Sequence, residues 1–364
     1  MNKHRLAFVG AGRVADVHYA SLQSLSQRAR LVAFCDTRPE AVAARQREWG
    51  APGFRSFQDL LGAVETDAVC LFLPHHVHLE NVALAAQAGK PVLLEKPLAG
   101  TLADAQAIAD TVARAGIQLF LTHTGLFHPA FQQVLDFVRR GWLGRPVYGR
   151  GISAGWLTFR PWDFRLKRNE TGGGCWIDAG NHLVYCFREI FGAVERVTGI
   201  TARLTRPEME GEDHAIGVLK YRSGAIAELF VSYGHKLPGY QHDWPQGYLN
   251  AIEIYGDQGA IRYVISPVPE ISYFSEIPEA MPPGLQGWLT HTPSQPYTYS
   301  FQAVMEHFLD CLDTGAVPRV TAQDGLDTLD VLLKLYAESA SDPGAQAAPD
   351  PVSQHSSRND CAGH

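Results

Sequence analysis

The chain begins with a short apolar run that breaks directly into closely spaced glycines. Residues 6–9 show no polar alternation, as a strand buried on both faces requires. Gly10 and Gly12 follow, and apolar residues from Val14 onward recur at helical spacing. In this order Gly10 permits a tight turn, Gly12 lets a pyrophosphate approach the backbone, and Ala15 keeps the helix close to the strand. Because the N–H groups of a helix N-terminus attract anions, the pattern predicts a dinucleotide-binding turn.

A second apolar run over residues 31–35 ends in Asp36, close to the spacing of roughly 20 residues at which this fingerprint carries an acid. Such a carboxylate hydrogen-bonds the adenosine ribose. The alternative is a strand-end carboxylate that caps the next helix. An ionised Asp36 would repel a 2′-phosphate, so the sequence favours NAD over NADP. The guanidinium of Arg38 could hold that phosphate, which keeps NADP open.

Strand and helix patterns alternate through the first third of the chain. Repeated strand–helix units imply an α/β fold with a doubly wound parallel sheet of the Rossmann type. We expect a dinucleotide-binding domain over residues 1–124, with ligands beyond the carboxyl ends of the strands. Further strands are predicted over 53–55, 67–73, 91–94 and 117–122, and helices over 40–49, 79–88, 101–115, 127–140 and from a Ser56 cap.

A different pattern begins near Gly144. Long strands with turn residues between them predict a C-terminal α+β domain over residues 125–340, with a large, mostly antiparallel open sheet. One face would be covered by helices and the other left free for a subunit. The composition of residues 341–364 predicts a disordered tail. The strands are expected over 146–156, 195–206, 215–221, 225–233, 250–255 and 260–264, and two closing helices, able to pack on the first domain, over 301–313 and 323–340.

The composition narrows the partners and the compartment. A formal charge of −7 without a basic run gives no electrostatic basis for binding nucleic acid or an anionic membrane. The apolar stretches are strand-sized, so no membrane span is expected, and the N-terminus shows no export signal. Six scattered cysteines without a Cys-x-x-Cys pair favour reduced thiols in a cytoplasmic protein.

Polar residues follow three of the predicted strands. His75, His76 and His78 could mark a metal site, a cofactor or substrate contact, or the polar start of a helix. We expect no metal, because no further ligands lie at suitable spacing. Lys96 in Glu95-Lys96-Pro97 emerges from an apolar strand over the sheet edge, the alternative being a surface ion pair. His123 and Thr124 follow the sixth strand.

A second motif, Gly172-Gly173-Gly174 followed by Asp178 and His182, lies in the second domain. The glycines would loosen the backbone before a helix running to about residue 191. Because Asp178 and His182 are spaced i, i+4, they would share a helix face. A carboxylate beside an imidazole can raise its basicity and fix its orientation, as a general acid/base requires. The alternatives are a buried structural Asp–His hydrogen bond and an N-terminal cap.

The chain resembles the glucose–fructose oxidoreductase/inositol dehydrogenase family (Gfo/Idh/MocA) over roughly residues 6–339. The resemblance rests on Glu95-Lys96-Pro97 after the first turn, together with G-G-G-x-x-x-D-x-G-x-H. The resemblance implies a Rossmann domain, a C-terminal domain whose open sheet forms dimers or tetramers, and Lys96 as the active-site lysine. Asp178 and His182 would be the acid/base pair. Arg165 matches a family Trp-Arg that approaches the cofactor, although Phe164 replaces the Trp and Trp162 would compensate.

The sequence departs from the family where substrates are chosen. Tyr185 stands where an Asp is frequent, and Thr124 and Gly125 replace an Arg or Asn. Aromatic side chains could supply platforms for a sugar ring. The expected cofactor contacts are Gly10, Gly12, Arg13, Val14, Asp36, Arg38, Leu73, Pro74, His75, His78, Glu95, Lys96 and Arg165. The expected substrate contacts are Lys96, Trp156, Trp162, Asp178, His182 and Tyr185, with Trp176 and Trp244 as further platforms.

The sequence thus predicts NAD-dependent oxidation of a secondary hydroxyl on a sugar, glycoside or cyclitol. His182 would take the hydroxyl proton, Asp178 would orient and charge the imidazole, and Lys96 would stabilise the developing negative charge. One alternative is glycoside cleavage by transient oxidation and elimination on retained NAD. Another is a non-catalytic sugar or dinucleotide sensor, against which the complete set of proton-transfer residues argues.

Overall fold

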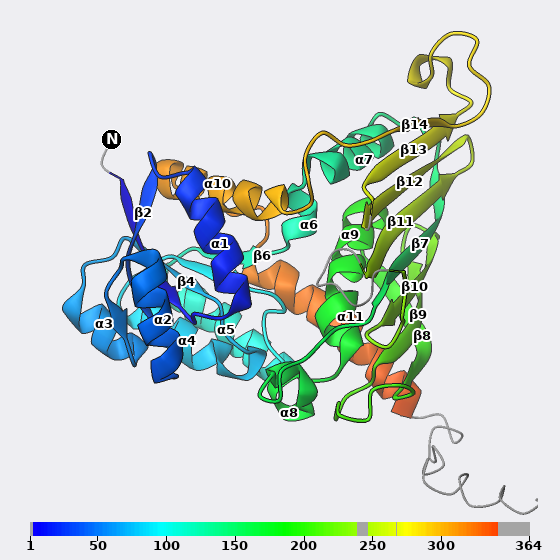
Figure 1. Ribbon diagram of the computed structural model, residues 1–364. Helices are drawn as coiled ribbons and strands as arrows, with labels where there is room; N and C mark the ends of the chain where they lie inside the picture. Colours follow the sequence, from blue (N-terminus) through cyan, green and yellow to red (C-terminus); the bar gives the residue numbers. More distant parts are fainter. Residues whose placement is uncertain (1–2, 239–246, 267, 341–364) are drawn as a thin grey trace, which may run out of the picture.

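The computed structural model describes residues 3–238, 247–266 and 268–340, which form two sheets joined by helices (Figure 1). The first sheet has six parallel strands in the order β3-β2-β1-β4-β5-β6, so the strand order reverses between β1 and β4. This confirms the predicted doubly wound Rossmann sheet. The strands are β1 (His4–Val9), β2 (Ala29–Cys35), β3 (Gly53–Phe54), β4 (Ala68–Leu71), β5 (Val92–Glu95) and β6 (Leu119–Thr122).

Two helices of this unit begin at side-chain caps that the sequence provides. Ser56 and Thr101 accept hydrogen bonds from main-chain N–H groups three residues ahead, at 3.0 and 3.1 Å. The strand predicted over 67–73 ends earlier, at Leu71, because Pro74 and the 3₁₀ turn His75–Val77 follow. The helices are α1 (Arg13–Ser24), α2 (Pro39–Trp49), α3 (Phe57–Ala63), α4 (His78–Gln87) and α5 (Leu102–Ala115).

The second sheet has eight strands in the order β14-β13-β12-β11-β7-β10-β9-β8. Only β7 and β10 pair in parallel within it, which confirms the mostly antiparallel prediction. The strands are β7 (Pro146–Gly155), β8 (Val194–Ala202), β9 (His214–Tyr221), β10 (Ile226–Ser232), β11 (Tyr248–Gly256), β12 (Gly259–Ser266), β13 (Glu270–Ser275) and β14 (Leu289–His291).

Three predictions about these elements were wrong. β13 and β14 were not foreseen. β8 stops before the predicted end at residue 206, because the amides of Leu204, Thr205 and Arg206 donate to the buried Asp213 carboxylate instead of to a neighbouring strand. The helix predicted over 127–140 begins only at Pro129, as α7 (Pro129–Arg139), and a separate turn, α6 (Thr124–Phe127), precedes it, since proline disfavours a helical residue before it.

One face of the second sheet is covered by α7, α9 (Asn181–Phe191) and α11 (Ala322–Ala340) (Figure 1). The opposite face carries exposed apolar side chains, which alternate along β9 and β10 with buried ones. They are Ile200, Ile216, Val218, Ile226 and Tyr255. The predicted open sheet with one covered face is therefore confirmed.

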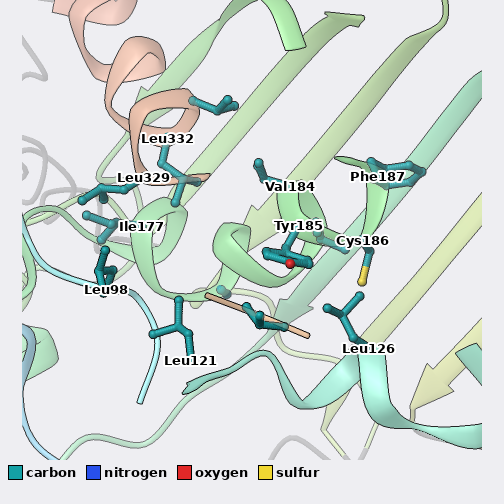
Figure 2. Close-up of a cluster of buried hydrophobic side chains, with 14 of the residues drawn as sticks. Leu98, Leu121, Leu126, Ile177, Val184, Tyr185, Cys186, Phe187, Leu329 and Leu332 are labelled. Atoms are coloured by element: carbon teal, nitrogen blue, oxygen red, sulfur yellow. The ribbon is translucent and has the colours of Figure 1, made fainter. Parts of the chain in front are cut away.

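The closing helices join the two sheets into one body. α10 (Tyr299–Thr314) packs on α1, and its Met305 and Phe308 lie in the same core cluster as Phe8 of the Rossmann sheet. Figure 2 shows the other junction, where Leu98 and Leu121 of the first unit meet side chains of α9 and α11. The predicted boundary near residue 124 stays a prediction, and the tail over 341–364 lies outside the described residues.

The described part of the chain lacks two kinds of feature. No helix there is both long and apolar enough to cross a bilayer. Nor do three or more His, Cys, Asp or Glu side chains gather there in a metal-binding arrangement.

Candidate active site between the two sheets

The first glycine turn has the shape that a dinucleotide requires. Gly10 has φ +93°, and a Cβ there would stand 2.2 Å from the Phe72 carbonyl oxygen, so only glycine fits. A Cβ on Gly12 would meet nothing within 4 Å, which leaves open space in front of the first turn of α1. The N-cap of α1 is Gly12, which has no side chain to cap the helix, and such a helix N-terminus attracts anions. Arg13 and Val14 begin that helix.

Asp36 lies at the tip of β2 and faces the glycine turn. Its carboxylate accepts the Ala11 N–H at 2.9 Å and is held by the Arg38 guanidinium at 3.1 and 3.2 Å. Burial alone would raise the pKa of Asp36, but hydrogen bonds from Arg38 and Ala11 lower it, so the carboxylate is ionised. The N-cap of α2 is Arg38, so Asp36 does not cap that helix, which removes the alternative interpretation.

Glu95 connects β5 to α1. Its carboxylate lies 3.0 Å from Nε2 of His18, a fully buried histidine that stacks on Phe72 with ring centroids 4.4 Å apart. The surface Glu95–Lys96 pair weighed above is therefore wrong, since each side chain has its own partner. Sequence reasoning missed His18. Its signal was a histidine on the otherwise apolar face formed by Ala15 and Leu22.

The histidines after β4 hold loops together. Both ring nitrogens of His78 face main-chain carbonyls, those of Leu98 at 3.2 Å and Leu73 at 3.0 Å, and the ring is fully buried. His75 Nδ1 lies 2.9 Å from the Thr171 carbonyl. Burial lowers the pKa of His75 to about 3, so the imidazole is neutral. Their predicted contacts with a cofactor, like those of Leu73 and Pro74, stay predictions.

The centre of the site is the Asp178 carboxylate. Lys96 Nζ donates to its Oδ1 at 2.5 Å and to its main-chain carbonyl at 2.9 Å. Arg165 Nε and the Tyr233 hydroxyl donate to Oδ2 at 2.9 and 2.7 Å. Burial would raise the pKa of Asp178, but the charges of Lys96 and Arg165 outweigh it and hold that pKa well below its usual range. The site therefore contains a permanent anion clamped by two cations and a phenol.

The expected Asp178–His182 pair does not form. Residues Trp176–Gly180 adopt a π-helical turn, which changes the angular spacing on which the i, i+4 prediction depended. No hydrogen bond within the described chain joins the two side chains, because both Asp178 oxygens are taken by Lys96, Arg165 and Tyr233. Burial, and then the charge of Lys96, lower the pKa of His182 to about 3. The charge of Asp178 acts to raise that pKa, as predicted, but burial and Lys96 outweigh it, so the expected net gain in basicity of His182 does not occur.

The glycine triplet lets neighbouring backbone segments pack closely, and it does not serve to make the chain flexible. Gly172 has φ +85°, and a Cβ there would stand 2.3 Å from the Gly100 carbonyl oxygen of the Rossmann unit. A Cβ on Gly174 would stand 2.0 Å from the Glu212 carbonyl oxygen. The Glu212 carboxylate in turn accepts the N–H groups of Gly174 and Trp176 at 3.1 and 2.9 Å. The triplet thus fixes the segment that carries Asp178 between two backbones.

Gly174→Ala is expected to destabilise the protein by about 3 kcal/mol, because the added methyl must displace buried backbone. Urea unfolding measures the change. Gly62→Ala is the matched control: Gly62 lies in α3, and a Cβ added there would have nothing within 4 Å, so a change within about 1 kcal/mol is expected. Equal stability of Gly174→Ala and wild type would contradict the packing argument.

Arg165 reaches the site with a different aromatic partner from the one expected. Its guanidinium lies 4.7 Å from the Phe164 ring, and Nη1 donates to Asp163 at 3.1 Å. Trp162 is 61 % exposed and pairs with Arg160. Phe164 is therefore the aromatic ring that packs against Arg165. The expectation that Trp162 takes the place of the family Trp was wrong.

The other aromatic candidates have separate surroundings. Trp156 lies beside Arg206 and Lys236, at 4.3 and 4.6 Å from the ring centroid. Tyr185 is buried and stacks on His123. Trp176 is fully buried and its indole donates to the Leu332 carbonyl at 3.1 Å, so its predicted role as a platform was wrong. Trp244 lies outside the described residues. The substrate contacts of Trp156, Trp162 and Tyr185 stay predictions.

Comparison with known proteins agrees with this architecture. Residues 4–123 match the model of an oxidoreductase family with an NAD-binding Rossmann fold, and residues 131–262 match the GFO/IDH/MocA C-terminal domain. D-apiose dehydrogenase from Paraburkholderia graminis is 29 % identical over 336 residues, covering 91 % of this chain and 86 % of that protein. The NAD⁺-dependent scyllo-inositol 2-dehydrogenase from Bacillus subtilis is 26 % identical, covering 90 % and 91 %.

A solved structure shares the whole arrangement. An oxidoreductase from Agrobacterium radiobacter, crystallised with NAD⁺, L-tartaric acid and magnesium, superposes with a TM-score of 0.79. It is 25 % identical in sequence, and the match covers 93 % of this chain and 97 % of that one. The similarity therefore extends over both sheets.

Proposed function

Because the chain belongs to the GFO/IDH/MocA family of NAD-binding oxidoreductases, we propose that it oxidises a secondary hydroxyl of a sugar, glycoside or cyclitol. The observation that carries the proposal is the junction of Lys96, from the tip of β5, with Asp178, from the second unit, next to His182. An ammonium and an imidazole from the two halves thereby reach the edge of the sheet that binds the dinucleotide. The relatives that act on D-apiose and scyllo-inositol support this substrate class.

Lys96 is the residue that binds and polarises the substrate oxygen. An ammonium has three N–H groups, and Asp178 accepts from it at two oxygens. One N–H is left to donate to a hydroxyl, and its charge stabilises the alkoxide character that develops as the proton leaves. Asp178 is thus a positioning residue that aims Lys96, and Tyr233 and Arg165 fix Asp178 in turn.

His182 takes the hydroxyl proton. Because its pKa lies near 3, the imidazole is neutral at any ordinary pH and has a nitrogen ready to accept.

The residues at the strand tips fit NAD. The open space at Gly12 and the uncapped start of α1 would hold the pyrophosphate, with Arg13 and Val14 at its side. Asp36 would accept hydrogen bonds from the adenosine ribose. Glu95 and Arg165 would border the other end of the cofactor site, next to Lys96 and Asp178. NAD, when bound, accepts the hydride. The remaining chemistry is the stabilisation of the reacting oxygen by Lys96 and proton transfer to His182.

Asp36→Ser is expected to raise the preference for NADP over NAD, as a ratio of kcat/KM values, about 100-fold. It removes a fixed negative charge and releases the Arg38 fork for a 2′-phosphate. Initial rates with each cofactor measure the ratio. Asp67, also bound to an arginine but at the amino end of the sheet, is the matched control, and Asp67→Ser should leave the ratio unchanged. An unchanged ratio in Asp36→Ser would contradict the ribose role.

The assembly and the compartment complete the proposal. The exposed apolar face of β8, β9, β10 and β11 would pair two copies into a homodimer or homotetramer. The five cysteines of the described chain are free and buried, as in a reducing cytoplasm. Sedimentation of the purified protein tests the first point.

The function itself is tested with a panel of aldoses, methyl glycosides and cyclitols, each with NAD and NADP, followed by absorbance of the reduced nicotinamide. Formation of NADH with at least one polyol is expected. Product formed without accumulation of NADH would favour glycoside cleavage on retained NAD. No reaction by a protein that still binds NAD would favour a sensor.

A further inference from the structure

His123 occupies the position after β6 that Lys96 occupies after β5. Glu95 and Thr122 are register partners, and the Lys96 N–H donates to the Thr122 hydroxyl at 3.3 Å. Lys96 and His123 therefore leave adjacent strands about 5 Å apart at the same sheet edge. The His123 ring also stands edge-on to the His182 ring, with centroids 6.3 Å apart. His123 is thus a neighbour of both residues that would share the reacting oxygen.

One ring nitrogen of His123 is buried without a hydrogen-bond partner among the described residues. The side chain is only 2 % exposed, and its Nε2 finds no partner among the described residues. Buried polar atoms without partners are rare and destabilising, so such an atom calls for a ligand or an ordered water. Oδ1 of Asn181, in the residue before His182, is in the same condition. Two unpartnered polar atoms therefore belong to residues beside the proposed base.

The ring is also held rigidly and kept neutral. It stacks on Tyr185 with centroids 4.1 Å apart and planes inclined by 28°. Burial is the main cause that lowers the pKa of His123 well below its usual value, and the neighbouring His182 and Lys96 contribute to it. A neutral imidazole offers one donor and one acceptor. This suits a hydroxyl, which can also do both, better than a carboxylate or phosphate, which only accepts.

We propose that His123 is a specificity-determining residue that hydrogen-bonds the hydroxyl on the carbon next to the oxidised one. The inference rests on the proposed function, because it is Lys96 and His182 that place the reacting oxygen. In a vicinal diol the second hydroxyl is on the carbon next to the oxidised one. His123 borders both Lys96 and His182, and therefore lies on the side of that neighbouring carbon. The substrate class is therefore narrowed to ring polyols with a free hydroxyl beside the reacting one.

The test compares the best polyol of the panel with its analogue lacking the neighbouring hydroxyl. For the wild type, removing that hydroxyl should lower kcat/KM about 10- to 100-fold. His123→Phe keeps a ring on Tyr185 but has no nitrogen. In this variant, kcat/KM for the parent polyol should fall by the same factor. The two compounds should then differ less than about 3-fold. His123→Asn, which retains an amide, should recover part of the difference.

Controls separate this effect from loss of structure. His307→Phe replaces another histidine that lies against aromatic rings, on α10, and should leave the ratio of the two compounds as in wild type. The midpoint of thermal unfolding and NAD binding, followed by tryptophan fluorescence, should be retained in His123→Phe. If His123→Phe lowered kcat/KM equally for the parent and the deoxy compound, this inference would be overturned and the proposed function would stand. No oxidation of any polyol by the wild type would overturn the proposed function and this inference with it.

Discussion

Lys96→Ala is expected to lower kcat by about 10³-fold while NAD binding changes less than about 3-fold. The variant removes the ammonium that donates to the reacting oxygen, and electrostatic stabilisation of this kind contributes about 10²–10³ per donor. Asp178 keeps Arg165 and Tyr233 as partners, so the second unit should keep its structure. Steady-state rates with a polyol from the panel and NAD titration by tryptophan fluorescence measure the two effects.

Lys90 provides the matched control. It precedes the same strand at the opposite edge of the sheet, where its ammonium donates to the Thr66 carbonyl at 2.8 Å. Lys90→Ala should leave kcat unchanged within about 2-fold. If Lys96→Ala retained more than a tenth of the wild-type kcat, Lys96 would not be the residue that polarises the substrate.

His182→Ala is expected to lower kcat for alcohol oxidation by about 10²–10⁴-fold, the usual contribution of a positioned general base. In the wild type, the pKa near 3 keeps the base form present at every higher pH, and only below it would the imidazole be protonated. The kcat/KM profile should therefore show no loss from protonation of His182 between pH 8 and pH 5.

The exposed His291 on β14 serves as the control for this variant. His291→Ala should leave both kcat and the pH profile unchanged. Two results would contradict the role of His182: a fall of less than 10-fold in His182→Ala, or a wild-type acid limb near pH 6.5 that disappears in that variant.

The Rossmann half could be predicted because its evidence is local. Gly10, Gly12 and Asp36 follow apolar runs at fixed spacing, and each residue's role depends on its own strand and turn. The β5 tip was found in the same way, as a lysine emerging from an apolar strand. One strand end was misplaced because a side chain replaced the ladder, as Asp213 does at the end of β8.

The partners within the site could not be predicted from spacing. The i, i+4 rule supposes a regular α-helix, and the π turn at Trp176–Gly180 removed that condition before His182. Tyr233 gave no signal as the last residue of a predicted strand. The neutral state of His182 likewise follows from burial, which a linear pattern does not describe.

What the sequence determined by itself was the inventory: a dinucleotide turn, an acid at the second strand, and a lysine, an aspartate and a histidine for proton chemistry. The tertiary structure alone decided how these are paired. A buried carboxylate must be neutralised by nearby cations, and the fold brings Lys96 and Arg165 to Asp178 from different elements. Asp178 is therefore held by the lysine and the arginine, while burial leaves His182 neutral.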